Sequence, residues 1–497
     1  MTQRHGLGLL GMALLLGVLG DGLLRSAPWG INFPLWLAVA IAGGWAVLPD
    51  GTDRPRISGW PLLAALFFAV CIAWRDAEFL RFWNAVAVMG LLSLPIVEMR
   101  SRSLKTTAIT GYLLGIADAG AGILRGAFAP LPAATAWGHF VRYRGNVGAG
   151  AIGVALSLPI LIVFGSLLVF ADAGFANLVH RVVRVNTEVA ASHIALAGVV
   201  TWICAGYICA LMRRREDRDV ADAEPVPTHP VLGVVEIGIP LGALAALFAT
   251  FLGVQANYFF GGEEAMSRAG LIYSEYARQG FIELTFASAL LLPLLLGADW
   301  VFSPGQARHR VWFRRLVACL LVLTAALMGS ALHRVALYVN EYGWTEIRLY
   351  ATAFIIWLGT VHLAFATTVL RGRRHRFVFR AMATGLAVLG TLNVLNPEAV
   401  IVRSQLDRYA HSGQIDAEYL VRLSADAIPP LVQAMPILPT GARAAIEQAR
   451  QTRWQRIEGK DWRSWNVSRA NAHDALRGTH AVIQSGARTE RSPSRPE

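Results

Sequence analysis

The chain has 497 residues, of which 55% are hydrophobic and only 16% are charged. Soluble proteins carry about 25% charged residues, so this composition excludes an ordinary soluble domain and indicates an integral membrane protein. The net charge of +12 comes largely from short Lys and Arg clusters between apolar runs, which is typical of topogenic charge rather than of nucleic-acid binding.

About eleven apolar runs approach or exceed the ~20 residues that a helix needs to cross a bilayer core. The runs are continuous, which predicts an all-α, polytopic transmembrane helical bundle and excludes a membrane β-barrel. The first run follows Arg4 like a signal peptide, but it has no convincing cleavage site, so we expect an uncleaved helix. The runs cover residues 7–24, 31–48, 60–74, 82–97, 148–171, 190–212, 231–254, 280–296, 316–332, 347–370 and 377–395.

Residues 105–147, between the fourth and fifth runs, leave the number of spans open at about ten to twelve. This region has the length of a helix but is interrupted by glycines, by Asp118 and by Arg125. It is either a poor span or an interfacial or re-entrant segment, which is tolerated only where it is buried in protein or lies at the surface.

The last run ends at Asn396-Pro397, where the composition changes. Residues 1–397 are therefore predicted to form the transmembrane domain. Residues 398–480 are polar with amphipathic helical patterns, which predicts a small helical domain outside the bilayer. Residues 481–497 are rich in Ser, Arg and Pro and are predicted to be a disordered tail.

The distribution of basic residues predicts which loops share a side of the membrane. If residues 105–147 do not cross, the loops on one side carry more than twice as many Lys and Arg residues as the loops on the other. The rich side is expected to be cytoplasmic. This predicts a multi-pass protein of the bacterial cytoplasmic (inner) membrane, with its N-terminus in the cytoplasm and its C-terminal domain extracytoplasmic.

On the predicted outer side, ionisable residues recur at the ends of the spans. Glu275, Gln279 and Glu283 share one helical face, and Arg278 can pair with Glu275. Glu283 lies about one turn inside an apolar run, where an unpaired carboxylate is costly, so we expect it to pair or to be protonated. The complete predicted polar cluster is Asp21, Arg25, Glu275, Tyr276, Arg278, Gln279, Glu283, His333, Arg334, Glu341, Glu346 and Arg348.

Two interpretations of this polar cluster are open. It is either a site for a substrate, ion or proton at the outer leaflet, or an ion-pair network that fixes helix packing and docks the C-terminal domain. The sequence has no catalytic or nucleotide-binding motif and no paired Cys/His array, so no catalytic residue, metal or cofactor is predicted. His193 and His362 are expected to be packed, and the four cysteines to be inert buried thiols.

Several longer stretches are similar to a known family. They are GDGLLRSAPWGINFPLW, FGSLLVFADAGFA, YSEYARQGFIEL, SALHRVALYVNEYGWTEIRLYATAF, LNVLNPEAVIVRSQLDRYAHSGQIDAEYLVRLSADAIPPL and DWRSWNVSRA. In these stretches the chain resembles the bacterial membrane proteins grouped as DUF4173, a family of unknown function close to DUF4153. The resemblance implies one polytopic unit with a C-terminal extension, and it implies no activity.

We therefore expect a non-enzymatic envelope protein that binds a partner or responds to a signal. Its expected partners are the lipid bilayer and an envelope protein or small molecule at the outer face, not nucleic acid. The alternative is a secondary transporter or channel that uses Glu283, Glu275 and Arg278. A membrane-embedded enzyme acting on lipid-linked substrates is a third reading, which nothing in the residue spacing requires.

Overall fold

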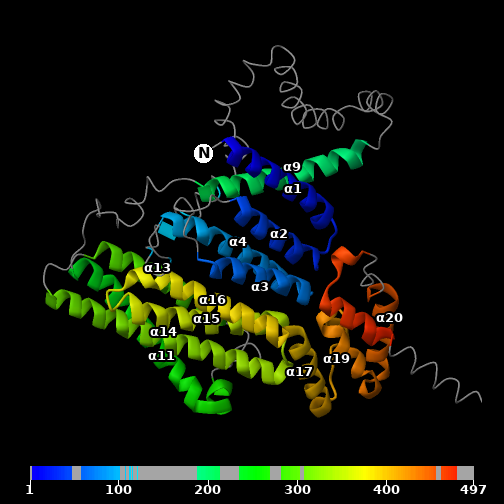
Figure 1. Cartoon of the computed structure of the whole chain (residues 1–497). Helices are drawn as coiled ribbons and strands as arrows, with labels where there is room; N and C mark the ends of the chain where they lie inside the picture. Colours follow the sequence, from blue (N-terminus) through cyan, green and yellow to red (C-terminus); the bar gives the residue numbers. More distant parts are fainter. Residues whose placement is uncertain are drawn as a thin grey trace, which may run out of the picture.

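The computed structural model describes residues 3–47, 58–100, 187–212, 234–268, 281–302, 307–454 and 461–477, with a few isolated positions between 104 and 120. The regular elements in these ranges are α-helices and short 3-10 helices, which confirms the all-α class for the described part of the chain. The long helices run side by side, and the helices after residue 396 gather at one end of them (Figure 1).

Where it is described, the first half of the bundle follows the predicted apolar runs closely; the predicted run 148–171 and nearly all of residues 105–147 lie outside the described part. Helix α1 packs along α9 around Leu16 and Val200, and α3 packs along α4 around Phe68 and Leu91. Helix α2 lies between these two pairs (Figure 1). The bounds are α1 (Gln3–Leu24), α2 (Asn32–Val47), α3 (Trp60–Trp74), α4 (Glu78–Arg100) and α9 (Thr187–Met212).

The second half of the bundle has the largest apolar core, built around fully buried residues such as Leu295, Leu320 and Phe365. Helix α16 joins the two halves because it packs on α15 and also on α4. The bounds are α11 (Val234–Arg268), α13 (Phe281–Val301), α14 (Ala307–Tyr342), α15 (Glu346–Thr368) and α16 (Phe377–Leu395).

Two of these helices extend beyond the predicted runs. Helix α11 continues as far as Arg268, so the first part of the polar stretch after residue 254 is helical. Helix α14 begins before and ends after the predicted run 316–332. Hydropathy marks only the part of a helix that lies in lipid, whereas backbone hydrogen bonding continues into the polar flanks.

Four helices of the described chain are long and apolar enough to cross a membrane: Glu78–Glu98, Arg308–Tyr342, Glu346–Thr368 and Arg374–Leu395. Six further apolar helices are shorter. Large apolar side chains on the bundle surface, such as Val322 at 70% exposure and Leu363 at 64%, are arranged as lipid-facing residues would be. The protein is thus a helical membrane protein, and the count of about eleven spans stays a prediction.

The C-terminal segment, residues 397–477, begins at a sharp turn. Asn396 has a left-handed backbone (φ 52°), and its side chain accepts a hydrogen bond from Ala399 N, which caps α17. The segment has its own apolar core, which includes Leu431, Ile446 and Trp454. It contains α17 (Pro397–Ser412), α18 (Ala417–Leu420), α19 (Ile428–Gln433), α20 (Thr440–Thr452) and a last helix at 467–477. Residues 478–497, including the predicted tail, lie outside the described part.

The turns α1–α2, α3–α4 and α14–α15 all contact the C-terminal segment. Ile31 N donates to Trp465 O at 2.8 Å, Arg75 pairs with Asp426 at 3.2 Å, and the Gln405 side chain donates to Trp344 O at 3.0 Å. These turns therefore share one end of the bundle, the docking end, as the charge pattern predicts for loops on one side. Which compartment the docking end faces stays a prediction.

Candidate functional site: the junction at the docking end

Asp426 is the central residue of the junction between the bundle and the C-terminal segment. The residue is 3% exposed. Its carboxylate accepts from Arg75 Nη1 at 3.2 Å, from the backbone N–H groups of Asp76 and Ala77 at 2.6 and 3.0 Å, and from Ser468 Oγ at 2.5 Å. A buried charge is tolerated only when donors surround it. This carboxylate therefore needs its partners on the bundle.

The position of these partners follows from the local structure. The N–H groups of Asp76 and Ala77 come just before α4, where the first amides of a helix lack intrahelical partners and carry partial positive charge. Asp426 lies in a 3-10 turn (Ala425–Ala427) that Ser424 caps. The C-terminal segment thus supplies an anion to the amino end of a membrane helix.

Residues 461–469 form the second part of the junction. Asn466 donates to the carbonyls of Ile72 and Arg75 at 3.0 and 3.1 Å, so it satisfies acceptors at the carboxyl end of α3. A Cβ on Gly30 would lie 2.1 Å from Trp465 O, so only glycine allows this close backbone approach. The stretches GDGLLRSAPWGIN and DWRSWNVSRA therefore meet in space.

A third part is an ion-pair group around Asp76. Its carboxylate lies 3.1 Å from Arg81 Nη1 and 3.5 Å from Arg469 Nε, and Arg469 also donates to Trp29 O at 3.0 Å. Burial raises the pKa of Asp76, although the charges of Arg469 and Arg81 oppose this rise. One carboxylate thus faces two guanidiniums.

Glu398, at the start of α17, is a second buried carboxyl group beside Asp426. One oxygen accepts from Ser424 N at 2.9 Å and from Ser424 Oγ at 2.6 Å. Burial raises the pKa of Glu398 to about 8, the Ser424 hydrogen bond opposes the rise, and the nearby charge of Asp426 adds to it. This group is therefore largely protonated at neutral pH.

Deeper in the bundle, Asn84 of α4 and Asn393 of α16 exchange two side-chain hydrogen bonds, each 2.9 Å long. Both residues are fully buried. Reciprocal amide pairs of this kind hold membrane helices together, because an unpaired amide in hydrocarbon is costly. This pair fixes the two helix ends from which the junction is built.

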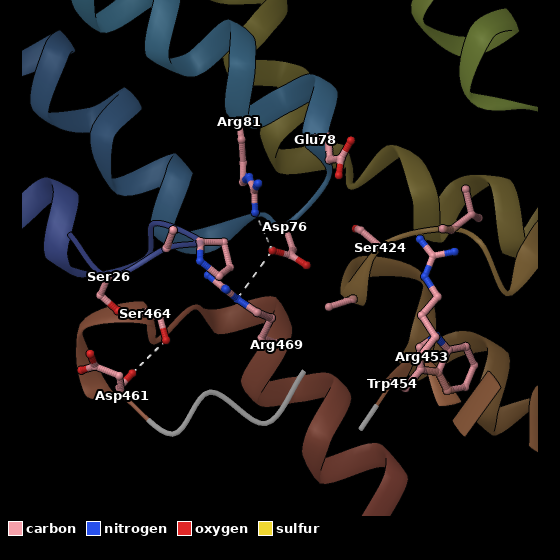
Figure 2. Close-up of a pocket in the computed structure, with 14 residues that line it drawn as sticks. Ser26, Asp76, Glu78, Arg81, Ser424, Arg453, Trp454, Asp461, Ser464 and Arg469 are labelled. Carbon is pink, nitrogen blue, oxygen red and sulfur yellow. Dashed lines mark hydrogen bonds and ion pairs between the residues drawn. The ribbon is translucent and has the colours of Figure 1, made fainter. Parts of the chain in front are cut away.

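A cavity of about 460 Å³, which we call the junction pocket, lies between the bundle and the C-terminal segment. Figure 2 shows Arg81, Asp76 and Arg469 linked on one side, with Arg453 on the other side beyond Ser424. The lining residues come from the α1–α2 turn, the start of α4 and three parts of the C-terminal segment. Such a concave space lined by convergent polar groups is the usual form of a ligand site.

The predicted polar cluster is distributed over several places. Asp21 and Arg25 pair at 3.1 Å on α1, and the His193 ring of α9 lies 2.5 Å from the Asp21 carboxylate. The expectation that His193 is packed is wrong, because its side chain is 46% exposed and pairs with Asp21. His362 is buried, as expected, and donates through Nδ1 to Leu358 O within its own helix. The residues Glu275, Tyr276, Arg278 and Gln279, and the side chain of Glu283, lie outside the described part of the chain.

The cluster members at the α14–α15 turn contact the C-terminal segment through their backbone. The carbonyl of Glu341 accepts from Arg408 at 2.9 Å, and the N–H of Glu346 donates to the Tyr419 hydroxyl at 2.9 Å. The Arg348 guanidinium lies 4.2 Å from the centre of the Tyr338 ring. His333 and Arg334 lie further inside α14, where Arg334 is buried.

The residues that make the junction were not predicted from the sequence as site residues. Arg75 and Arg81 counted only as loop charges, and Glu398, Asp426, Ser468 and Arg469 were not singled out. Only the family resemblance could have pointed to Glu398, Asp426, Ser468 and Arg469. These four residues lie in the resembling stretches LNVLNPEAVIVRSQLDRYAHSGQIDAEYLVRLSADAIPPL and DWRSWNVSRA. Among the described residues, no group of His, Cys, Asp and Glu has a metal-binding arrangement.

The helices and the junction define a class: a helical membrane protein with a C-terminal segment docked on one end of its bundle. A family model described as "Domain of unknown function (DUF4153)" matches residues 62–434, and the chain belongs to that family. The match includes Asp76 and Asp426 but ends before residues 461–477. Neither the curated proteins nor the solved structures gave a match.

Proposed function

We propose that this protein is a non-enzymatic receptor-like component of the bacterial cytoplasmic membrane. In this proposal the docking end faces outside, and the junction pocket receives a partner or ligand from the envelope. The observation that supports it is the cavity of about 460 Å³ between the bundle and the C-terminal segment. A ligand held by both parts would stabilise the docked arrangement over an undocked one, in proportion to its differential affinity.

Exposed apolar side chains near the pocket suit contact with a partner. Trp462 is 63% exposed and Trp465 is 48% exposed. The carbonyl of Trp465 accepts from Ile31 N of the α1–α2 turn, and Trp462 follows the pocket residue Asp461. Tryptophan is enriched both in protein interfaces and at the headgroup level of membranes. The surface around residue 462 is therefore the place to look for a partner.

Photo-crosslinking in living cells tests this proposal. A photoreactive residue in place of Trp462 should give one crosslinked product of defined size. The matched control is the same residue in place of Val322, which is 70% exposed on the bundle and predicted to face lipid. The proposal is wrong if no product forms at 462, or if both positions give the same products.

The side of the membrane needs a separate measurement. Ser412 is exposed in the C-terminal segment. Among the described cysteines, Cys71 and Cys204 are buried as expected, but the expectation is wrong for Cys319, which is exposed. A Ser412→Cys variant that also carries Cys319→Ala should react with a membrane-impermeant maleimide in intact spheroplasts. Reaction only after lysis would place the docking end in the cytoplasm and refute the proposed orientation.

A further inference from the structure

The charges around the junction pocket do not balance within the described residues. Asp461 is matched by its neighbour Arg463, with 2.6 Å between Nη2 and Oδ2. Asp76 alone faces both Arg81 and Arg469. Figure 2 shows the Glu78 carboxylate on the far side of Asp76 from Arg469. With Asp461 matched by Arg463, the other charged lining residues are two carboxylates and three guanidiniums, which leaves a formal excess of one positive charge: Asp76 and Glu78 against Arg81, Arg453 and Arg469.

Arg469 is the most buried of the pocket arginines, at 9% exposure. Its Nη2 donates to Trp29 O at 3.0 Å, and its Nε lies 3.5 Å from Asp76 Oδ1 but makes no hydrogen bond. Within the described part of the chain its Nη1 has no hydrogen-bond partner. A buried guanidinium with unused donors is costly unless an acceptor arrives.

Arg453 approaches the pocket from the C-terminal end of α20. Its guanidinium is exposed and makes no ion pair with the other described residues. Figure 2 shows it across from Asp76 and Arg469, with Ser424 between them. Three guanidiniums from three separate elements thus line one cavity.

We propose that the junction pocket binds a phosphate group, carried either by a phospholipid headgroup or by a soluble phosphate ester, with Arg469, Arg81 and Arg453 as its donors. Planar guanidiniums recognise phosphate through paired hydrogen bonds, and the excess positive charge favours a dianion or monoanion over a neutral ligand. The volume of about 460 Å³ falls in the range of small-ligand sites. The junction pocket lies at the ends of α1 and α4, which is the level where the headgroups of a bilayer would lie. This inference rests on the proposed function, because it names the ligand class of the same pocket.

The test uses the full chain purified in a maltoside detergent. Binding of glycerol 3-phosphate is measured by calorimetry, and retention of phosphatidylglycerol is measured by native mass spectrometry. Arg453→Gln should weaken binding about tenfold, since a hydrogen bond to a charged group contributes roughly 1.5–3 kcal/mol. Arg422→Gln is the matched control, because Arg422 is exposed in the same segment and its closest carboxylate is 3.9 Å away.

The two binding measurements distinguish the two possible sources of the phosphate group. Retention of the lipid with weak binding of the ester identifies a headgroup site, and comparable binding of both identifies a phosphate-ester site. No binding of either probe, or binding that Arg453→Gln leaves unchanged, overturns the phosphate assignment. The crosslink at position 462 separates the two proposals, because it would persist if only the ligand class is wrong and would be missing if the receptor role is wrong.

Discussion

Helices α11 to α15 meet through side chains such as Leu295, Leu320 and Phe365, whereas the junction is made of carboxylates, guanidiniums and amides. In a bilayer, lipid tails are as apolar as leucine, so apolar contacts between helices gain little beyond close packing. Each contact around Asp426 is directional and leaves a buried polar group unpaired if it is lost. Close packing therefore holds helices α11 to α15 together, whereas the polar junction specifies where the C-terminal segment sits.

The largest expected effect comes from the junction. Asp426→Ala removes the common acceptor of Arg75, Ser468 and the first amides of α4, and should destabilise the docked segment by about 3–5 kcal/mol. Limited proteolysis of the purified full chain should then cut within residues 397–477. Glu418→Ala is the control, because its side chain is 85% exposed and such changes stay within about 0.5 kcal/mol. Unchanged protease resistance in Asp426→Ala would show that the junction does not hold the segment.

The close approach at the α1–α2 turn gives the next effect. Gly30→Ala places a methyl group 2.1 Å from Trp465 O and 2.7 Å from Ser464 O, which are backbone atoms, and should cost about 3 kcal/mol. Gly44→Ala has no atom within 4 Å of its new methyl group and should be neutral or slightly stabilising. Thermal unfolding of both variants measures this difference, and equal midpoints would contradict the packing at Gly30.

The bundle core should respond less than the junction. Leu320→Ala leaves a cavity at a fully buried position and should cost about 2 kcal/mol, at the low end for such changes because hydrocarbon replaces water as the reference. Val322→Ala, at a 70% exposed position, is the control and should have almost no effect. Unfolding in mixed detergent micelles tests both. If Leu320→Ala costs more than Asp426→Ala, the proposed difference between the two regions is wrong.

The smallest effect is a dependence on pH at the junction. The pKa of Glu398 is raised to about 8 by burial from its ordinary value of 4.5, so the folded state holds this proton more tightly than the unfolded state. Its contribution is fully present below pH 4.5 and is lost as the pH rises through about 8. Stability of the docked segment should fall by about 2 kcal/mol or less between pH 6 and 8.

Glu398→Gln removes this titrating group while keeping an acceptor for Ser424, so it should flatten the pH profile. The protease resistance of residues 397–477, measured at several pH values, is a suitable readout. Glu418→Gln should keep the slope of the parent protein. A slope that persists unchanged in Glu398→Gln would assign the pH dependence to another group, such as Asp76, whose pKa is also raised.

Which turns lie at the same end of the bundle could be predicted in part from the sequence. The alternation of eleven predicted spans placed the α1–α2, α3–α4 and α14–α15 turns on one side of the membrane. In the structure these three turns lie at one end of the bundle, and the side of the membrane stays a prediction. Of the predicted polar cluster, Asp21 and Arg25 pair with each other, and Glu341 and Glu346 contact the C-terminal segment through their backbone. A binding role for the cluster stays a prediction. Glu283 and its neighbours stay predictions.

The sequence by itself determined where the described membrane helices lie, because runs of apolar residues must satisfy their backbone groups internally in lipid. It determined some of their ends, such as Asn396-Pro397 after α16, but not those of α11 and α14, which continue into polar flanks. Only the tertiary structure decided that Asp426 meets the amino end of α4, that Trp465 lies against Gly30, and that three arginines line one pocket. Asp426 and Trp465 are hundreds of residues away from their partners on the bundle. No local pattern encodes such a contact, because it forms only when separately folded helices pack and buried charges find their partners.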